Sequence, residues 1–468
     1  MAFMKQSRLQ SRLHDTVFAG RQAEKPLPKF HFPKQESQAA DVKQLVEDEL
    51  FLDGNPRQNL ATFCQTYEED EVRHIMNLAI DRNMIDKTEY PQTAELEIRC
   101  AHMLADLWHA PNVGKSIGTS TVGSSEACML GGMAAKWRWR ARQQAKGKPT
   151  DKPNLVCGPV QVCWEKFCRY WDIEMRQVPM TSDRFLMDAQ SMIELVDENT
   201  ICVVPTFGVT YTGHYEDIKP IAQALDRLAE EKGIDVDIHV DAASGGFLGP
   251  FCAPEIEWDF RLPRVKSIST SGHKYGLAPL GVGWIVWRDR EDLPEDLVFS
   301  VPYLGGSVGT FAINFSRPAG QVAAQYYLFN RLGFEGYKRV HSACYETALW
   351  ISDEIEKLGP FTFINRGAAS DGIPASCFRI TPGHEDSLGY NLYDLSDRLS
   401  TRGWQVPAFQ LMDGAKDIAI MRLMVRQGVS RDMASLLIDD MKRAIEGFKK
   451  RPVPVGLTEK ERGAYSHN

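Results

Sequence analysis

A lysine between two apolar runs is the residue of this sequence best suited to covalent chemistry. Lys274 stands in SISTSGHKYGLAPLGVGWIVW, after a run that ends near Ser269 and before a run that begins at Val282. A lysine amine becomes nucleophilic when burial or a nearby cation lowers its pKa, and it then forms a Schiff base with a carbonyl compound. On this segment alone, a solvent-exposed turn lysine is an equal alternative.

Asp241 supplies a partner for that chemistry. It ends the run IHVD 33 residues before Lys274 and is followed by Ala242, Ala243 and Ser244. A carboxylate beside small residues leaves room for a flat ring and can keep a pyridine nitrogen protonated, as pyridoxal phosphate requires of its site. Taken alone, the carboxylate could instead cap the following turn. The aspartate and the lysine together favour a pyridoxal phosphate cofactor.

A turn rich in glycine and serine offers a phosphate site. GTSTVGSSEACML places Gly118, Gly123, Ser124 and Ser125 before a helical pattern. The free amides and the dipole of a helix N-terminus attract anions. We expect Ser124 to be the N-cap, with Glu126 in the first turn. The segment matches neither a P-loop nor a dinucleotide motif, which disfavours a nucleotide ligand.

The strands and helices that must position these residues can be predicted from the sequence. Over residues 120–287, short β-rich runs alternate with helical patterns. The strand candidates begin at Asn154, Glu174, Ile201, Val236, Val265 and Val282. Such alternation predicts an α/β fold with a mostly parallel sheet that helices cover on both faces. Ligands of such sheets lie at the carboxyl ends of the strands.

The pattern changes after about Ala343 to a helix (ETALWISDEIEKLG), a strand (SCFRIT), a helix (LYDLSDRLSTRG) and a strand (IAIMRLMV). We therefore expect a smaller C-terminal α/β domain. The predicted organisation is an N-terminal arm (1–57), a large cofactor-binding domain (58–345), a small domain (346–450) and a C-terminal tail (451–468).

The arm carries basic residues at Lys5, Arg8 and Arg12, with Leu9 and Leu13 between them. This spacing predicts a short amphipathic helix that rests on a surface or on a partner. A frayed terminus is the alternative.

Composition limits the classes of function. Among 468 residues, 54 Lys and Arg stand against 62 Asp and Glu, and the net charge of −8 disfavours nucleic acid as a partner of the whole chain. Because neither a run of about 18 apolar residues nor a secretory signal core is found, a cytoplasmic protein is expected. The ten cysteines lack CxxC pairs, so we expect buried, reduced thiols and no metal site.

Several long segments closely resemble glutamate decarboxylases of the bacterial and plant type, over about 52–428. They are DGNPRQNLATFCQTY, GSSEACMLGGMAAKWRWR, VVPTFGVTYTGHYE, HVDAASGGFLGPF, RLPRVKSISTSGHKYGLAPLG, GTFAINFSRPAGQ and RGWQVPAF. The resemblance implies the pyridoxal-phosphate-dependent aspartate aminotransferase fold (fold type I). It also implies a homo-oligomer, either a dimer or a hexamer, with active sites at subunit interfaces. The implied reaction converts L-glutamate to 4-aminobutyrate and CO2 and consumes one proton, for acid tolerance or for 4-aminobutyrate supply.

The resemblance assigns roles to residues that match the family's cofactor site. Lys274 would carry the pyridoxal 5'-phosphate as a Schiff base, with His273 beside it and Asp241 at the pyridine nitrogen. Ser124 and Ser125 match the phosphate-binding pair.

Four further residues match the family's cofactor contacts. Gln161 and Ala243 would lie on opposite faces of the ring, and Thr210 would approach the ring oxygen. Ser316 would come from the neighbouring subunit to lie near the phosphate. Gln161 separates this group from aromatic amino-acid decarboxylases, which carry a histidine there.

The resemblance also implies a substrate pocket. Arg422 would hold the α-carboxylate, a bidentate role that suits guanidinium. Thr62, Phe63 and Asp86 would surround the side-chain carboxylate, partly across the dimer. Two carboxyl groups close together share a proton, which predicts an acidic optimum.

The termini differ from the family pattern. His467, in GAYSHN, matches the place where some relatives use a histidine to close the site at neutral pH; a disordered tail is the alternative. No long basic segment with tryptophan follows Arg451, so calmodulin is not an expected partner. The remaining alternatives are a related decarboxylase or lyase for another amino acid, and a silent scaffold that retains the fold.

Overall fold

The computed structural model describes residues 29–301, 308–458 and 460–461. The chain divides into two units, Met1–Gln58 and Asn59–Asn468. In the first unit, the described elements are α2 (Ala39–Leu50) and η1 (Pro56–Gln58). The predicted basic helix (Lys5, Arg8, Leu9, Arg12, Leu13) and the tail residue His467 lie outside the described residues.

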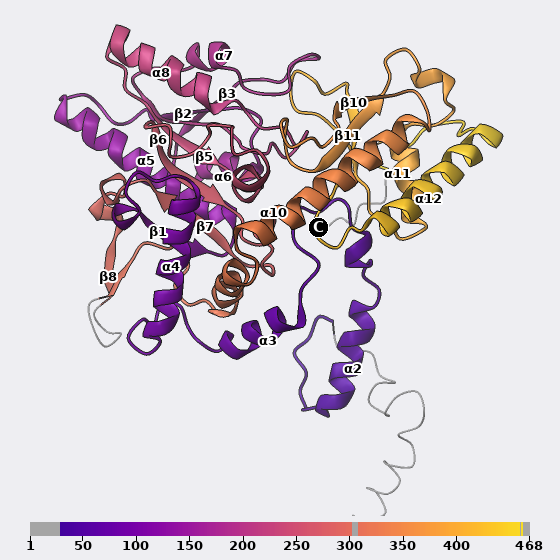
Figure 1. Cartoon of the computed structure of the whole chain (residues 1–468), viewed down its shortest axis with the longest axis horizontal. Helices are drawn as coiled ribbons and strands as arrows, with labels where there is room; N and C mark the ends of the chain where they lie inside the picture. The colour runs from indigo at the N-terminus through magenta and orange to yellow at the C-terminus, as the bar shows by residue number, and fades with distance from the viewer. Residues whose placement is uncertain (1–28, 302–307, 459, 462–468) are drawn as a thin grey trace, which may run out of the picture. The chain divides into compact units, whose positions relative to one another are not determined.

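The second unit contains a seven-stranded sheet in the order β1-β7-β6-β5-β4-β2-β3 (Figure 1). The pairs from β3 to β6 are parallel, whereas β7 runs antiparallel to both β6 and β1. The bounds are β1 (Ile117–Thr121), β2 (Asn154–Cys157), β3 (Glu174–Gln177), β4 (Thr200–Val204), β5 (Asp237–Asp241), β6 (Val265–Thr270) and β7 (Gly283–Trp287). All six predicted strands are present, and the mostly parallel sheet is confirmed.

Helices connect and cover these strands. They are α3 (Asp70–Ala79), α4 (Pro91–Leu107), α5 (Ser124–Ala145), α6 (Val162–Tyr170), α7 (Ala189–Ile193), α8 (Ile218–Lys232) and α9 (Gly249–Cys252), with short turns η2 (Val113–Lys115), η3 (Gly245–Phe247), η4 (Arg290–Asp292) and η5 (Glu295–Leu297). In α8, Ile218, Ile221, Leu225 and Leu228 are buried at helical spacing, so one face packs on the sheet. A hairpin of β8 (Phe299–Val301) and β9 (Val308–Thr310) follows.

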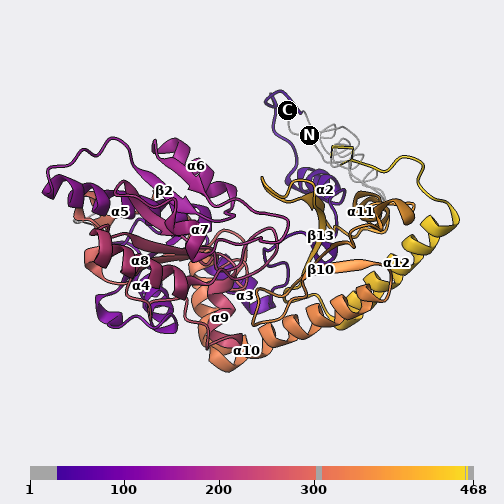
Figure 2. The same ribbon diagram turned by 90° about the horizontal axis from the view of Figure 1, so that it is seen from above.

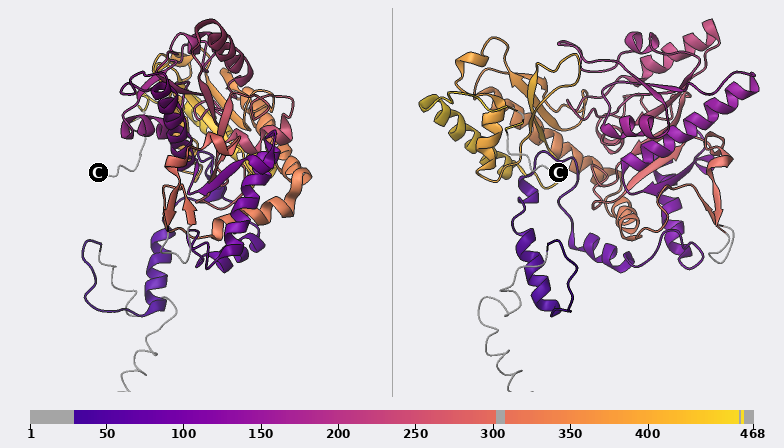
Figure 3. Two further views of the ribbon diagram at one scale, coloured as in Figure 1. Left: turned by 90° about the vertical axis from the view of Figure 1, so that its left-hand side faces the viewer. Right: turned by 180° about the vertical axis from the view of Figure 1, so that it is seen from behind.

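A smaller antiparallel sheet has the order β10-β11-β13-β12. Its strands are β10 (Phe361–Asn365), β11 (Ala375–Ile380), β12 (Ala408–Gln410) and β13 (Ala419–Met424), with η6 (Glu385–Ser387), α11 (Leu392–Ser400) and α12 (Arg431–Lys450). In Figure 3, right, these orange and yellow elements gather apart from the purple and pink elements of the large sheet.

The helix α10 (Gly320–Glu356) extends from the large-sheet elements to the small-sheet elements (Figure 2). It bends at Gly333, whose φ of 57° ends one helical segment and starts the next. Tyr337 and Tyr345 join the core of the large sheet, whereas Ala348 and Ile351 join that of the small sheet.

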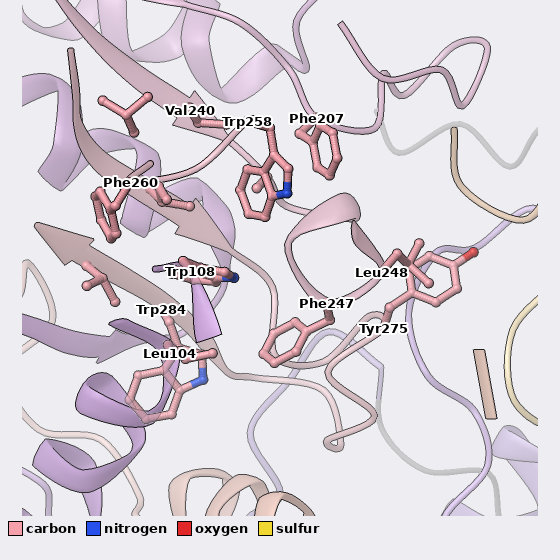
Figure 4. Close-up of a cluster of buried hydrophobic side chains, with 14 of the residues drawn as sticks. Leu104, Trp108, Phe207, Val240, Phe247, Leu248, Trp258, Phe260, Tyr275 and Trp284 are labelled. Atoms are coloured by element: carbon pink, nitrogen blue, oxygen red, sulfur yellow. The ribbon is translucent and has the colours of Figure 1, made fainter. Parts of the chain in front are cut away.

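An aromatic core includes Phe207, Phe247 and Trp258 (Figure 4). Phe207 stacks between Tyr215 and Trp258, with ring centroids 3.8 and 4.4 Å away. Trp108 meets Trp258 edge to face and donates a 2.9 Å hydrogen bond to the carbonyl of Gly246. The hydrogen bond from the buried ring of Trp108 ties this core to the backbone of the loop, whereas Nε1 of Trp258 has no partner among the described residues. The core therefore holds the loop after β5 in place.

The predicted N-cap of α5 is wrong by one residue. Gly123 is the N-cap and Ser124 is the first helical residue, and no side chain caps this terminus. The extended backbone ends at Gly123 (φ 163°, ψ 173°), where a Cβ would lie 3.0 Å from Cε1 of His273, and the helix begins at Ser124. The first amides of α5 are therefore left open to a ligand.

In the part of the chain that the structure describes, no helix combines the length and the apolar character that a membrane span requires.

Candidate active site

A cavity of about 370 Å³ lies at the carboxyl ends of the central strands. Eight predicted cofactor residues line it: Ser124, Ser125, Gln161, Thr210, Asp241, Ala243, His273 and Lys274. The other lining residues are Val122, Gly123, Glu126, Cys163, Thr206, Gly208 and Ser244. The fold thus brings together segments that are up to about 150 residues apart, as expected for strand ends of a parallel sheet.

Asp241 is held in one orientation at the end of β5. Its Oδ2 accepts a 2.9 Å hydrogen bond from Nε1 of Trp164, and its Oδ1 accepts one of 3.1 Å from the amide of Ala243. The side chain is buried. A buried carboxylate with two fixed donors is suited to receive a cationic N–H from a ligand.

The turn that carries Lys274 is tied to the Asp241 segment. The amide of Ser271 donates to the carbonyl of Ala243 at 3.1 Å, and that of Ala242 donates to Ser269 at 2.9 Å. Because β5 and β6 are parallel neighbours, their carboxyl ends lie side by side. The two motifs found in the sequence therefore meet at one edge of the sheet.

His273 is a neutral donor in this site. Its Nδ1 accepts hydrogen bonds from the amides of Gly281 and Val282 at 3.3 and 3.2 Å. The remaining nitrogen, Nε2, must then carry the proton of the neutral ring. Burial, followed by the positive charge of Lys274, lowers the pKa of His273 to about 4. The ring is thus uncharged at neutral and mildly acidic pH.

Glu126 joins the start of α5 to the segment after β9. Its Oε2 accepts from the amide of Val122 at 2.9 Å, and its Oε1 accepts from the amides of Ile313 and Asn314 at 3.0 and 3.1 Å. Three backbone donors on one carboxylate fix both segments. Glu126 therefore connects the phosphate-site candidate with the chain that leads to Ser316.

The ring of Phe63 contacts two cationic side chains. The Nζ of Lys274 is 5.1 Å from its ring centroid, and the guanidinium carbon of Arg422 is 4.6 Å from it. Such cation–π contacts stabilise both groups where water is scarce. The amide of Thr62 is held by Oδ1 of Asn59 at 3.1 Å, so the loop before α3 is fixed beside Lys274.

Arg422 is the buried cation of the site. Its guanidinium donates to the carbonyl of Thr210, and it donates to Ala61 at 3.4 Å, whereas its buried Nε has no partner. Burial lowers its pKa to about 10. A buried guanidinium with an unpaired N–H favours a carboxylate as its partner, and Arg422 lies behind the residues that line the cavity.

Gln161 is the N-cap of α6. Its Oε1 accepts a 2.7 Å hydrogen bond from the amide of Cys163. This contact fixes a side chain that lines the cavity.

Five predicted site residues of the described chain do not line the cavity: Thr62, Phe63, Asp86, Ser316 and Arg422. Ser316 is exposed and accepts a 3.2 Å hydrogen bond from Nδ2 of Asn83. Asp86, three residues after Asn83, is bonded through its backbone to Asn83 and Tyr90. Neither side chain lines the cavity of its own chain.

Trp164, Glu126 and Cys163 were not predicted as site residues. Trp164 contacts Asp241 across 77 residues, and Glu126 contacts Asn314 across 188. Local pattern carries no signal for such pairs. The position of Glu126 in the first turn of a helix was the one available hint, and it predicts only a favourable interaction with the helix dipole.

The cavity fits pyridoxal 5'-phosphate. The open amides and hydroxyls of Ser124 and Ser125 suit a phosphate, and the oriented carboxylate of Asp241 suits a protonated ring nitrogen. Lys274 offers an amine for the aldehyde. The donor set thus matches each functional group of the expected cofactor.

Comparison with known proteins agrees with this fit. A family model described as the pyridoxal-dependent decarboxylase conserved domain matches residues 33–381. A glutamate decarboxylase of Aliivibrio fischeri is 56% identical over 455 residues, which cover 97% of this chain and 97% of that protein. A glutamate decarboxylase of Solanum lycopersicum is 46% identical over 444 residues, covering 94% of this chain and 87% of that protein.

Solved structures lead to the same family. A glutamate decarboxylase of Lactobacillus brevis has a TM-score of 0.89 and 44% identity, covering 94% of this chain and 99% of that chain. A sphingosine-1-phosphate lyase of Burkholderia pseudomallei, 21% identical with a TM-score of 0.74, shares the fold over 91% of this chain and 94% of that chain. The predicted fold type I architecture is confirmed, and the chain belongs to the pyridoxal-dependent decarboxylase family, whose cofactor is pyridoxal 5'-phosphate.

Proposed function

We propose that the protein decarboxylates L-glutamate to 4-aminobutyrate and CO2, with the uptake of one proton. The observation that carries the proposal is the buried guanidinium of Arg422, whose Nε lacks a partner and which shares the ring of Phe63 with Lys274. This shared ring contact supports a carboxylate receptor near the reactive amine. The relatives of similar length that are named glutamate decarboxylases support the choice of substrate.

The cofactor roles proposed for the chain follow its donors. Ser124 and Ser125 hold the phosphate, Asp241 holds the ring nitrogen, and Lys274 carries the aldehyde carbon. When bound, pyridoxal phosphate supplies an electron sink for the bond that breaks at Cα. The carboxylate of Asp241 would favour the protonated form of the cofactor's ring nitrogen, which is the form that accepts electrons best.

Three further residues complete the proposed cofactor site. Gln161 and Ala243 contact the two faces of the ring, and Thr210 approaches the ring oxygen. The carbonyl of Thr210 accepts from Arg422, so the cofactor and substrate sites share one hydrogen-bonded connection.

In the proposed substrate site, Arg422 binds the α-carboxylate, and Thr62, Phe63 and Asp86 surround the side-chain carboxylate. Orientation of the substrate decides which bond at Cα breaks, so a rigid receptor for one carboxylate is required. The two ring contacts of Arg422, to Phe63 at 4.6 Å and to Phe409 at 5.2 Å, give it that rigidity.

The proton that replaces the carboxylate at Cα comes, in this proposal, from Nζ of Lys274. His273 is the other candidate, but its Nδ1 is occupied by two amides and its pKa of about 4 keeps it neutral. A neutral imidazole with Nε2–H positions an acceptor by donating a hydrogen bond, and it is a poor acid. His273 is therefore assigned to positioning.

We further propose a homo-oligomer in which a neighbouring subunit completes the site. Ser316 and Asp86 lie outside the cavity of their own chain, on a surface with the exposed apolar residues Ile313 and Phe315. A second copy that covers this surface would bring both side chains to a site. The dimer or hexamer, the cytoplasmic location, the role of His467 and the domain bounds stay predictions.

The test is the product formed by purified protein loaded with pyridoxal phosphate. L-Glutamate should yield equal amounts of CO2 and 4-aminobutyrate, whereas L-aspartate and aromatic amino acids should yield far less. Release of CO2 from another amino acid, with none from glutamate, would retain the cofactor chemistry and overturn the substrate.

A further inference from the structure

Two cysteines and the aspartate of the cavity lie together although they are far apart in the sequence. Cys128 lies one turn into α5, Cys163 lies in the first turn of α6, and Asp241 ends β5. One ligand atom from each lies within 4.8 Å of the other two, and all three residues are buried. We propose that the chain without cofactor binds a soft divalent cation, such as Zn2+ or Cd2+, through these three side chains.

The geometry is close to that of a zinc site. Three atoms at mutual distances of 4.8 Å or less surround a point no more than about 2.8 Å from each, if they are evenly spaced. Zinc–sulfur bonds of about 2.3 Å and zinc–oxygen bonds of about 2.0–2.2 Å need only a small contraction of this triangle. Two thiolates select zinc or cadmium over magnesium or calcium.

The surroundings leave the three donors available. The thiol of Cys128 contacts the thiol of Cys163 and lies 3.3 Å from Oγ of Ser269. Each oxygen of Asp241 accepts one hydrogen bond and retains acceptor capacity. The donors are thus held near one another by neighbours that a cation would not need to displace.

The cavity gives the ion a path and a fourth ligand. Cys163 and Asp241 both line the cavity of about 370 Å³, whereas Cys128 lies behind them. Water in that cavity can fill the remaining position of a tetrahedral ion, as in sites with three protein ligands. The site is therefore reached from the cofactor side.

The ion and the cofactor compete for Asp241. A cation bound to Asp241 neutralises the charge that would favour a protonated ring nitrogen, so each ligand weakens the binding of the other. This step depends on the proposed role of Asp241 and does not depend on the identity of the substrate. Bound cofactor would thus protect the cysteines, and its loss would expose them to soft metals.

The test titrates the full chain with Cd2+, with and without pyridoxal phosphate, by the ultraviolet charge-transfer absorption of cadmium thiolates. The cofactor-free chain should bind one ion, and saturating cofactor should weaken that binding at least tenfold. Cys128→Ser and Cys163→Ser should each weaken it about 100-fold. Cys252→Ser is the matched control, because this free cysteine of α9 does not line the cavity.

X-ray absorption of the zinc-loaded chain provides a second readout, with two sulfur ligands at about 2.3 Å expected. Circular dichroism confirms that the serine variants fold. Cadmium binding that survives both serine substitutions, or that is unchanged by saturating cofactor, overturns the proposal. Because no amino acid is present in these assays, their failure leaves the glutamate experiment unaffected.

Discussion

The indole Nε1 of Trp164 donates a hydrogen bond of 2.9 Å to Oδ2 of Asp241. The other oxygen of the carboxylate, Oδ1, accepts a hydrogen bond from the amide of Ala243. The ring of Trp164 is buried and meets His239 edge to face at 5.2 Å. The carboxylate proposed to hold the cofactor nitrogen is therefore oriented by an immobile donor from α6.

Trp164→Phe removes this donor and keeps most of the ring. A hydrogen bond to a charged group contributes about 1.5–3 kcal/mol, so the affinity for pyridoxal phosphate should fall roughly 10- to 100-fold. Equilibrium titration by cofactor absorbance measures the affinity. Trp139→Phe is the control, because its indole donates to the carbonyl of Glu198. An equal loss of cofactor affinity in both variants would show that Trp164 does not position Asp241.

Arg422→Lys keeps a positive charge but loses the planar fork of donors. We expect kcat/KM for glutamate to fall by at least tenfold, corresponding to about 1.5 kcal/mol or more, with the cofactor absorbance retained. Steady-state kinetics and the absorption spectrum provide the two readouts. Arg398→Lys, on α11 over the ring of Phe448, is the control. Unchanged kcat/KM in Arg422→Lys would remove this residue from the substrate site.

Glu126→Gln tests the connection between α5 and the segment that leads to Ser316. A glutamine cannot accept all three backbone hydrogen bonds that the carboxylate accepts. The amide that faces the new NH2 group loses its acceptor, so either the amide of Val122 or those of Ile313 and Asn314 should exchange with solvent roughly 10- to 100-fold faster, by hydrogen-exchange mass spectrometry. Glu165→Gln, exposed on α6, should leave that exchange unchanged. No acceleration in Glu126→Gln would show that other contacts hold this segment.

Stability should fall as the pH is lowered, because of buried histidines. Burial lowers the pKa of His341 to about 3, below its ordinary value of 6.5. The unfolded chain binds a proton below about pH 6.5, whereas the folded chain does not until about pH 3, so stability declines across this window. The decline contributed by one such residue is about 2 kcal/mol between about pH 6.5 and pH 5.

His341→Gln removes that titration, and urea unfolding at the two pH values should show a correspondingly smaller decline. His384→Gln, at an exposed position, serves as the comparison and should keep the original decline. The same decline in all three proteins would show that His341 is not buried in its neutral form.

A neighbouring subunit is proposed to supply Asp86. Lys274→Ala and Asp86→Asn proteins should each be inactive, yet mixing them under conditions of subunit exchange should restore activity. In a mixed dimer one of the two sites has both residues intact, so about a quarter of the wild-type activity is expected at equal mixing. An active mixture therefore supports a shared site, and a mixture that stays inactive after proven exchange contradicts it.

The parts of the site that lie at strand ends could be predicted from the sequence. Asp241 and Lys274 could be placed because each follows an apolar run of a parallel sheet, and such strand ends share one edge. The start of α5 was predicted to within one residue, and the close approach of His273 to the N-cap Gly123 was not predicted. That approach depends on tertiary packing, which local propensity does not contain.

Contacts between distant segments could not be predicted in this way. The cluster of Cys128, Cys163 and Asp241 joins three elements without a spacing motif, and the sequence favoured isolated buried thiols. Arg422 was assigned by resemblance alone. Its unpaired Nε depends on the packing of β13 beside Thr210, which the sequence does not show. Both features result from side chains of different elements that meet only in the folded chain.

The central claim is that Lys274 carries the cofactor. Its most direct test is borohydride reduction of the purified protein with bound pyridoxal phosphate, followed by peptide mass spectrometry. One pyridoxyl group per chain on Lys274, absent from Lys274→Ala, is the predicted result. A label on another lysine, or an unlabelled Lys274 in protein that forms 4-aminobutyrate, would contradict the account.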